Sequence, residues 1–262
     1  GSGFPPFETV NFIPLGAIFN PSGIAFEGVD ASDVKWADLN GDDAVDIVLI
    51  GQNAANEKIA KVYLNDGIST GSFTESNFDG DPGISDGTLS LGDYDGDGDI
   101  DVLVLGDDGD FSTTIYNNDG NGKLSDSNIP FEGLRNGQGL FGDYDNDGDL
   151  DVLITGESSG GPFTQIYQNT AGSFAPVSTS LPQAENSQVA FGDFDNDGDL
   201  DVALKGVLVN GVSRSVFSSI YLNNGSGDFP DVKQLPFTLL NGNYSLGDVN
   251  NDGNLDILMS GS

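Results

Sequence analysis

The chain has 262 residues, of which 42 are acidic, eight are basic and none is histidine or cysteine, and its formal net charge is −34. So few bases exclude the positive footprint that nucleic acids and anionic membranes need. The lack of histidine and cysteine excludes Ser-His-Asp and Cys-His catalysis and the usual ligand sets of zinc and copper. No apolar run is long enough to span a bilayer.

One acidic nine-residue loop recurs along the chain, at 38–46, 93–101, 143–151, 193–201 and 248–256. It is clearest at 93–101, DYDGDGDID, where aspartates alternate with glycine and one aromatic residue. The first aspartates of successive loops are 50 or 55 residues apart. Similar units at such a period predict one repeat array, so we expect residues 1–262 to form a single domain.

The loop composition predicts a calcium site, because alternating carboxylates repel one another unless a cation lies among them. Ca²⁺ takes six to eight oxygens at about 2.3–2.6 Å, whereas Mg²⁺ demands strict six-fold geometry and keeps several waters. By analogy with known calcium loops, side-chain oxygens would come from Asp93, Asp95, Asp97 and Asp101. Asp99 would give its backbone carbonyl and leave its carboxylate in water, while Gly98 would allow the sharp turn.

The same positions predict up to five structural Ca²⁺ ions, one in each repeat. The predicted ligands are Asp38, Asn40, Asp42, Ala44 and Asp46; Asp93, Asp95, Asp97, Asp99 and Asp101; Asp143, Asp145, Asp147, Asp149 and Asp151; Asp193, Asp195, Asp197, Asp199 and Asp201; and Asp248, Asn250, Asp252, Asn254 and Asp256. The first and fifth loops carry asparagine at ligand positions, and Asp43 replaces the turn glycine of the first. We therefore expect these two loops to bind calcium more weakly than the middle three.

The residues around each loop predict strands. An apolar and a tiny residue precede the loop, as in Leu91-Gly92, and a short apolar run such as Val102 to Leu105 follows it. Such short, glycine-bounded runs are typical of strands covered on both faces, so the loop joins two neighbouring strands. A third strand carries a tyrosine that we expect to pack between units: Tyr63, Tyr116, Tyr167 and Tyr221. The fourth strand is predicted to begin near Phe73, Leu124, Phe174 and Phe229.

Four antiparallel strands per unit, without a helical pattern, predict an all-β fold built of propeller blades. The last unit ends after its second strand, and the N-terminal segment resembles the missing part, since residues 24–28 match residues 129–133. Phe19 then falls in the column of Leu124, and residues 7–13 would be a third strand. We therefore predict a five-bladed β-propeller of four-stranded antiparallel blades, closed by the N-terminal segment completing the last blade, which would remove exposed edges.

The segment FGDYDNDGDLDVLITG (141–156) and its four relatives resemble the FG-GAP/VCBS repeat family. This family includes the head domain of integrin α subunits, several fungal and bacterial lectins and many secreted bacterial surface proteins. The resemblance implies calcium-bearing propeller blades. Familiar members are mostly seven-bladed, whereas closure here accounts for five blades. A smaller ring and a part of a larger protein therefore both remain open.

The calcium loops and the resemblance favour an extracellular role, because such loops in extracellular modules bind calcium at about 10⁻⁴–10⁻³ M. The leading hypothesis is a secreted or cell-surface, non-catalytic recognition module of adhesion or lectin type, binding a glycan or a protein partner. Recognition would fall to the variable loops between second and third strands, 52–59, 107–111, 157–163 and 207–215. Oligomeric state is not predicted.

Two other functions remain open. A glycan lyase or hydrolase would need paired carboxylates, and the candidates outside the loops are Glu57, Glu75, Glu157 and Glu185, each expected to be a solvated surface charge. A structural module of a larger secreted enzyme or adhesin is the third possibility. Trp36 shares a repeat column with Leu91 and Phe141, so it is predicted to pack in the core rather than to stack on a sugar.

Overall fold

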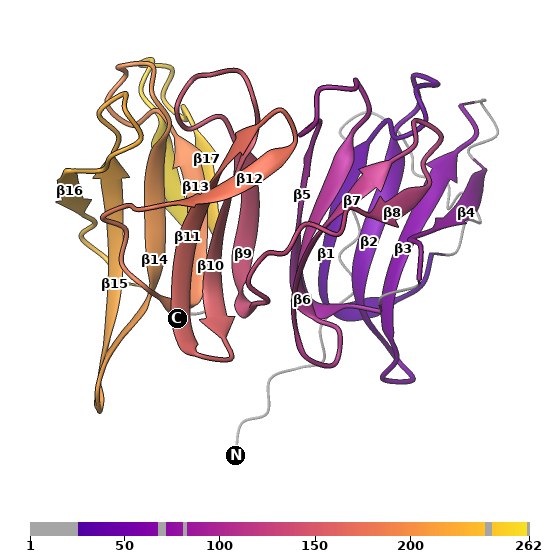
Figure 1. Ribbon diagram of the computed structural model, residues 1–262, viewed down its shortest axis with the longest axis horizontal. Coiled ribbons are helices and arrows are strands. Elements are labelled where there is room, and N and C mark those ends of the chain that lie inside the picture. The colour runs from indigo at the N-terminus through magenta and orange to yellow at the C-terminus, as the bar shows by residue number, and fades with distance from the viewer. Residues whose placement is uncertain (1–25, 68–71, 81–82, 239–242, 261–262) are drawn as a thin grey trace.

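The computed structural model describes residues 26–67, 72–80, 83–238 and 243–260. These residues form antiparallel β-sheets joined by turns and loops (Figure 1). The first sheet consists of β1 (Val29–Ala37), β2 (Asp46–Asn53), β3 (Lys58–Asn65) and β4 (Phe73–Asn77). The second consists of β5 (Ser85–Gly92), β6 (Asp101–Asp107), β7 (Phe111–Asn118) and β8 (Leu124–Asp126).

The remaining sheets repeat this order along the chain. The third consists of β9 (Arg135–Gly142), β10 (Asp151–Ser158), β11 (Gly161–Thr170) and β12 (Ser173–Val177). The fourth consists of β13 (Glu185–Gly192), β14 (Asp201–Asn210), β15 (Ser213–Leu222) and β16 (Asp231–Gln234). Within the described residues the fifth has two strands, β17 (Tyr244–Gly247) and β18 (Asp256–Met259). The prediction of an all-β fold with four-stranded antiparallel units is thus confirmed for the first four units.

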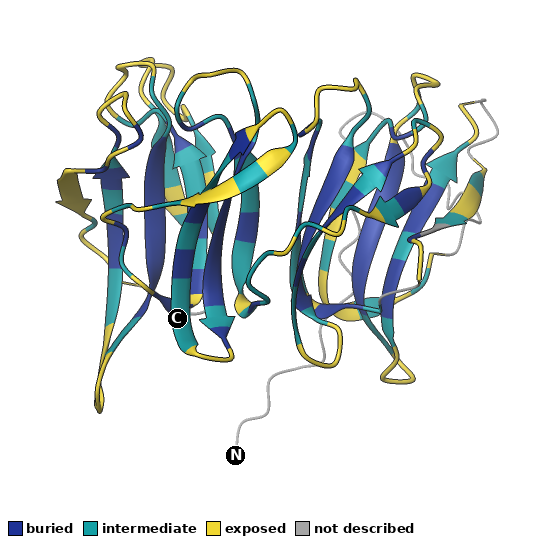
Figure 2. Ribbon diagram, viewed as in Figure 1, coloured by how far each residue is buried: buried dark blue, intermediate teal, exposed yellow. Residues whose placement is uncertain are grey.

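Each acidic loop joins the first strand of a sheet to the second, as predicted. The second strands β2, β6, β10 and β14 are buried along most of their length, and they stand out dark in Figure 2. For β6 and β10 both faces are covered because their sheets each pack between two neighbouring sheets, which explains why these strands read as continuous apolar runs. The fourth strands begin near the predicted residues, and β16 begins at Asp231, just after Phe229, which is only 1% exposed and packs in the core.

The sheets are arrayed through their first strands: β1 lies beside β5, β5 beside β9, β9 beside β13, and β13 beside β17. The apolar-glycine pair that ends each first strand makes the contact. A Cβ placed on Gly92 would lie 3.3 Å from Phe141 Cδ2, and one on Gly142 would lie 2.6 Å from Phe191 Cδ2. The apolar side chain of one sheet therefore occupies the space that the glycine of the preceding sheet leaves open. We call this contact the apolar-glycine joint.

The third-strand tyrosines were predicted to pack between units, but the aromatic partners of Tyr63 and Tyr167 come from the segment that enters the same sheet. Phe131, which precedes β9, meets Tyr167 and Phe174 edge-on with ring centroids 5.0 and 5.3 Å apart. Phe26 meets Tyr63 and Phe73 in the same way, at 5.0 and 5.1 Å. The predicted match between the segments around Phe26 and Phe131 is therefore seen in their packing.

Closure of a five-bladed ring is not confirmed. No sheet among the described residues closes the array, and the predicted third and fourth strands of the last blade, residues 7–13 and the segment at Phe19, lie outside those residues. The core prediction for Trp36 was wrong, since this side chain is 61% exposed. The physical reason is its place in the array: the other members of its column rest on a preceding sheet, and β1 belongs to the first sheet.

Candidate metal centres and central cavity

The last aspartate of each of the first four loops is a buried clip that holds the loop to its sheet. In the second loop, Asp101 is 1% exposed, and its two oxygens accept the backbone N–H groups of Tyr94 (3.3 Å) and Asn118 (2.9 Å). Tyr94 lies in the loop and Asn118 at the end of β7, so the Asp101 carboxylate at the start of β6 ties the loop to β7. The same pair of bonds is made by Asp46, Asp151 and Asp201.

A second clip, not predicted from the sequence, joins neighbouring sheets. Asn118 Nδ2 donates to Leu39 O in the loop of the preceding sheet (2.8 Å) and to Ile100 O in its own loop (3.1 Å). Asn169 and Asn223 donate to Tyr94 O and Tyr144 O, each at 2.7 Å. The signal was available, because an asparagine stands two residues after each third-strand tyrosine.

The first aspartate shapes the loop from inside. Asp93 Oδ1 accepts the N–H groups of Gly96 (2.8 Å) and Asp97 (3.1 Å), and its Oδ2 accepts that of Gly98 (3.0 Å). Gly98 has φ of 96°, a conformation that favours glycine, as the sequence predicted. The backbone thus wraps around one carboxylate and directs the alternate side chains toward a common point.

Carboxylates converge in the middle three loops, where one oxygen from each of three aspartates lies within 4.8 Å of the others. The groups are Asp93, Asp95 and Asp101; Asp143, Asp145 and Asp151; and Asp193, Asp195 and Asp197. Asp145 Oδ1 is buried without a hydrogen-bond partner. A buried anionic acceptor among other carboxylates fits a bound cation, and an all-oxygen donor set suits a hard ion such as Ca²⁺. These three clusters could each hold a metal ion.

The outer two loops are arranged differently. Among the described residues they contain no such cluster of three carboxylates. In the first, Asn40 Nδ2 donates to Asp42 Oδ2 (3.3 Å), and in the fifth, Asn250 Nδ2 donates to Asp252 Oδ2 (3.0 Å). In these two loops a side-chain amide donates to the carboxylate at the fifth position. In the middle three loops the neighbouring side chain is another carboxylate, so no such donor is present there. This geometry agrees with the expectation of weaker metal binding there.

The carboxylate at the seventh loop position was expected, from Asp99, to point to water, but in the third and fourth loops it accepts a hydrogen bond. Asp149 Oδ2 accepts the backbone N–H of Ala171 (3.0 Å), in the turn between β11 and β12. Asp199 Oδ1 accepts the side-chain amide of Asn146 (2.8 Å), in the loop of the preceding sheet. Neighbouring turns come close enough to use these oxygens, which sequence spacing alone does not reveal.

Without a cation, the last aspartates of the second and third loops are hard to ionise. Burial, opposed by the two backbone hydrogen bonds and reinforced by neighbouring aspartates, raises the pKa of Asp101 and that of Asp151 to about 7. An aspartate in the unfolded chain has a pKa of about 3.9. Between these values the folded state binds more protons than the unfolded state, so its stability falls as the pH rises.

We therefore expect protein freed of divalent cations to lose unfolding free energy between pH 5.5 and pH 8. Urea unfolding at both pH values measures the change. In the double variant Asp101→Asn, Asp151→Asn, the two titrating groups are gone, so the loss between these pH values should be smaller. A stability difference between wild type and variant that does not change with pH would contradict the assignment.

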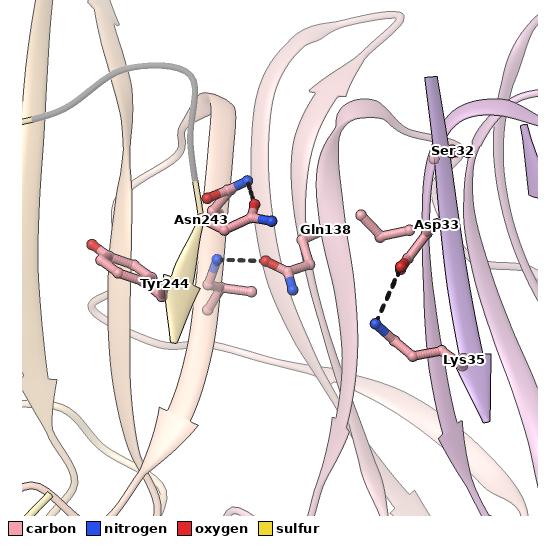
Figure 3. Close-up of a pocket in the computed structure, with 10 residues that line it drawn as sticks. Ser32, Asp33, Lys35, Gln138, Asn243 and Tyr244 are labelled. Atoms are coloured by element: carbon pink, nitrogen blue, oxygen red, sulfur yellow. Dashed lines mark hydrogen bonds and ion pairs between the residues drawn. The ribbon is translucent and has the colours of Figure 1, made fainter. Parts of the chain in front are cut away.

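A cavity of about 350 Å³ lies where the first strands of the sheets face one another (Figure 3). It is lined by Ser32, Asp33, Lys35, Gly87, Thr88, Gln138, Gln188, Val189, Asn243 and Tyr244, from β1, β5, β9, β13 and the start of β17. All five sheets therefore border one central space. Its lining is mostly polar, so we expect it to hold water.

A polar side chain lies five residues before each acidic loop, and these side chains form hydrogen bonds between the first strands that border the cavity. Asp33 Oδ2 accepts the N–H of Leu89 (2.9 Å), and Gln138 Oε1 accepts that of Val189 (3.0 Å). Thr88 Oγ1 accepts the N–H of Gly139 (3.4 Å) in the same way, whereas the Gln188 side-chain amide donates to Asn243 Oδ1 of the next sheet. The sequence analysis missed this column, although the repeat alignment contains it.

Each of the four glutamates considered for catalysis pairs with a different side chain, and no two of them form a carboxylate pair with each other. Glu75 pairs with Lys61 (3.0 Å), Glu157 with Arg135 (3.4 Å) and Glu57 with the Asn53 amide (3.0 Å). Glu185 pairs with Arg214 and is only 6% exposed, so the expectation of a solvated charge was wrong for this residue.

The architecture defines a class of protein: an array of four-stranded antiparallel sheets, each clipped by an acidic loop between its first two strands. The chain matches the FG-GAP-like repeat over residues 38–104, 93–154 and 143–204, which together span more than half of its length. It therefore belongs to the FG-GAP-like repeat family. A comparison with curated proteins found no match. The described residues contain no helix of the length and hydropathy needed to cross a membrane.

Proposed function

We propose that this protein is an extracellular, calcium-stabilised recognition module without catalytic activity, and that it binds a glycan or a protein at a cell surface. FG-GAP-like repeats are typical of extracellular recognition and adhesion modules and are generally non-catalytic. The ions would be Ca²⁺ held by the predicted ligands of each loop, most tightly in the middle three. Calcium supplies positive charge to the clusters, and the chain's own residues supply the clips that position them.

The observation that carries the proposal is the contrast between the two ends of the sheets. At one end the acidic loops repeat, and their polar groups are committed to the loop, the sheet and the neighbouring sheet. At the other end, hairpins join second to third strands and differ between sheets. Their turns are shorter than the predicted variable loops, because β14 and β15 continue to Asn210 and from Ser213. Variable, exposed turns on a rigid scaffold are suited to recognition.

The hairpin end presents polar and charged groups that suit a hydroxyl-rich ligand. Lys58 pairs with Asp107 across the first two sheets (2.6 Å), and Arg135 lies over the Phe111 ring with 4.6 Å to its centroid. The β14–β15 hairpin projects farthest at the lower end of Figure 1, and Val212 at its tip is fully exposed. Charged pairs beside an aromatic ring offer the directional contacts and stacking that sugars require.

A glycan array probed with and without calcium tests this function. We expect calcium-dependent binding that is lost in the double variant Asn210→Ala, Val212→Ser at the hairpin tip. The control Val45→Ser changes an exposed valine in the first acidic loop, at the opposite end, and should bind as the wild type does. If no glycan binds, the glycan ligand is wrong and a protein partner remains to be tested by cell-surface binding.

The enzymatic alternative has less support, because the four candidate glutamates are each engaged by a separate partner. A reducing-end assay on any glycan that binds distinguishes the two functions. Intact glycan after prolonged incubation is expected for a recognition module. Product formation would contradict the non-catalytic proposal.

A further inference from the structure

The strands that wall the central cavity share one backbone irregularity. In β1, β5, β9 and β13 an extra residue interrupts the pairing with the second strand just before the polar side chain at the cavity. Each of these β-bulges contains a residue with φ between 45° and 50°: Ala31, Asp86, Asn136 and Asn186. A β-bulge re-aims the side chains beside it, and bulges are over-represented next to active sites. The backbone of four sheets is therefore bent where it borders the cavity.

The cavity-facing position varies among the repeats, whereas the positions that hold the sheets together do not. The last loop aspartate is the same in all five repeats, and an asparagine follows each third-strand tyrosine at the same spacing. The position two residues after the bulge residue instead holds Asp33, Thr88, Gln138 and Gln188, and the fifth sheet has Asn243 there. A purely structural position would keep one residue type, as the two clips do. The variation indicates a wall shaped for contents that lack the symmetry of the repeat.

Polar groups of this wall have no hydrogen-bond partner among the described residues. Gln188 Oε1 is buried without one, while the Gln188 amide donates to Asn243 Oδ1. Gln138 Oε1 accepts the N–H of Val189 (3.0 Å), which leaves the Gln138 amide over. Within the described part of the chain, neither this amide nor that of Asn243 has an acceptor. The set is completed by contents that donate to Gln188 Oε1 and accept from the two amides.

The charges at the wall disfavour an ion as the occupant. Asp33 and Lys35 are the two charged residues of the lining, and they pair with each other (3.2 Å). Figure 3 shows both side chains pointing into the space between the sheets. Their charges cancel there, whereas a divalent cation needs several carboxylates. An anion would be repelled by the chain's net charge of −34.

The volume and the lining fit a small neutral molecule. The cavity volume of about 350 Å³ lies in the range of ligand pockets, about 300–1,000 Å³. Its wall includes the Tyr244 ring, which is fixed because the tyrosine hydroxyl forms a hydrogen bond with Ser218 Oγ (2.7 Å). A ligand hydroxyl can both donate and accept, which matches the mixed needs of Gln138, Gln188 and Asn243. An aromatic ring beside amides suits the C–H face and the hydroxyl edge of a sugar-like ring.

We propose that the central cavity binds one neutral, hydroxyl-rich molecule of a single ring, a monosaccharide or a cyclitol. Its hydroxyls accept from the Gln138 and Asn243 amides and donate to Gln188 Oε1, and its C–H face lies on the Tyr244 ring. This site is separate from the hairpin tips that we propose for surface recognition. It does not depend on that function.

Isosteric substitutions test this site with little change to the wall. Gln138→Glu keeps the acceptor for the Val189 N–H, and Asn243→Asp keeps the acceptor for the Gln188 amide, while each removes an unpartnered donor. The probes are D-glucose, D-galactose, D-mannose and myo-inositol, titrated into the full chain in calcium-containing buffer and followed by ligand-observed NMR. At least one probe should bind the wild type, and each variant should bind it about tenfold more weakly.

Two further variants control for the added charge and for the other site. Gln234→Glu makes the same amide-to-acid change on exposed β16 and should bind the probe as the wild type does. The hairpin double variant Asn210→Ala, Val212→Ser should also keep full affinity, because neither residue lines the cavity.

The side-chain amide signals of Gln138 and Asn243 in ¹⁵N NMR spectra, assigned by their loss in the two variants, give a second readout. Shifts of these signals on adding the bound probe, together with weaker binding by the variants, support the proposal. Binding that survives both substitutions, or that disappears in the hairpin variant, would overturn it by placing the ligand elsewhere. Amide signals that none of the probes shifts would also overturn it, and would leave the cavity to water.

Discussion

Replacing Asp151 with alanine is expected to lower the unfolding free energy by about 2–4 kcal/mol in the absence of calcium. The Asp151 oxygens accept the buried N–H groups of Tyr144 (3.1 Å) and Asn169 (2.8 Å), and alanine leaves both donors without a partner. An unsatisfied buried donor costs about 1–3 kcal/mol, and relief of the buried carboxylate offsets a part of the sum. Urea unfolding followed by circular dichroism, in protein freed of divalent cations, measures the loss.

The matched control is Asp149→Ala, two residues earlier in the same loop. Asp149 accepts one N–H, that of Ala171, at an exposed site where water can replace it. We expect its loss to stay within about 0.5 kcal/mol. Equal losses for the two variants would show that the last aspartate acts only through a bound metal and not as a clip.

Calcium is expected to raise the thermal unfolding midpoint, and its removal to lower it. A ligand that binds only the folded state stabilises it by about 2.7 kcal/mol per site at a hundredfold excess over its dissociation constant. Three occupied carboxylate clusters would therefore add three such increments to the free energy of unfolding. Scanning calorimetry of stripped protein, with calcium or magnesium added back, measures the effect, and magnesium should stabilise less.

Two variants locate the calcium effect in the loops. Asp145→Asn removes a charge from the third loop and places an amide where the buried, unpartnered Oδ1 lies, so it should reduce the calcium-dependent rise. Asp231→Asn removes the same charge from exposed β16 and should leave the rise unchanged. An unchanged midpoint on adding calcium to wild-type protein would overturn the metal assignment.

Much of the fold could be predicted because the informative residues lie close together in the sequence. The Asp93–Asp101 loop contains its own turn glycine, its alternating carboxylates and the starts of both flanking strands. The repeat period then extends that local result to the other loops. The start of β16 was predicted only approximately, because Phe229 packs in a core cluster and the strand begins just after it, at Asp231.

The candidate metal centres were also predicted only in their local features. The sequence predicted which aspartates alternate, and the structure brings three groups of them together. That Asp101 is first a hydrogen-bond clip could not be read from the sequence, because its partner Asn118 is distant along the chain. The carboxylate of Asp99 was placed in water by analogy, but at the equivalent positions Asp149 and Asp199 turns from the same or the preceding sheet reach the carboxylate.

By itself, the sequence determined the all-β class, the repeat, the family and the acidic loops, since each rests on residues within one short segment. The tertiary structure alone decided which groups are shared between sheets: the Asn118 clip to Leu39, the polar column around the central cavity and the exposure of Trp36. These features depend on where the neighbouring sheet lies. Trp36 shows this most clearly, because the same column is packed wherever a preceding sheet offers a glycine and is exposed where none does.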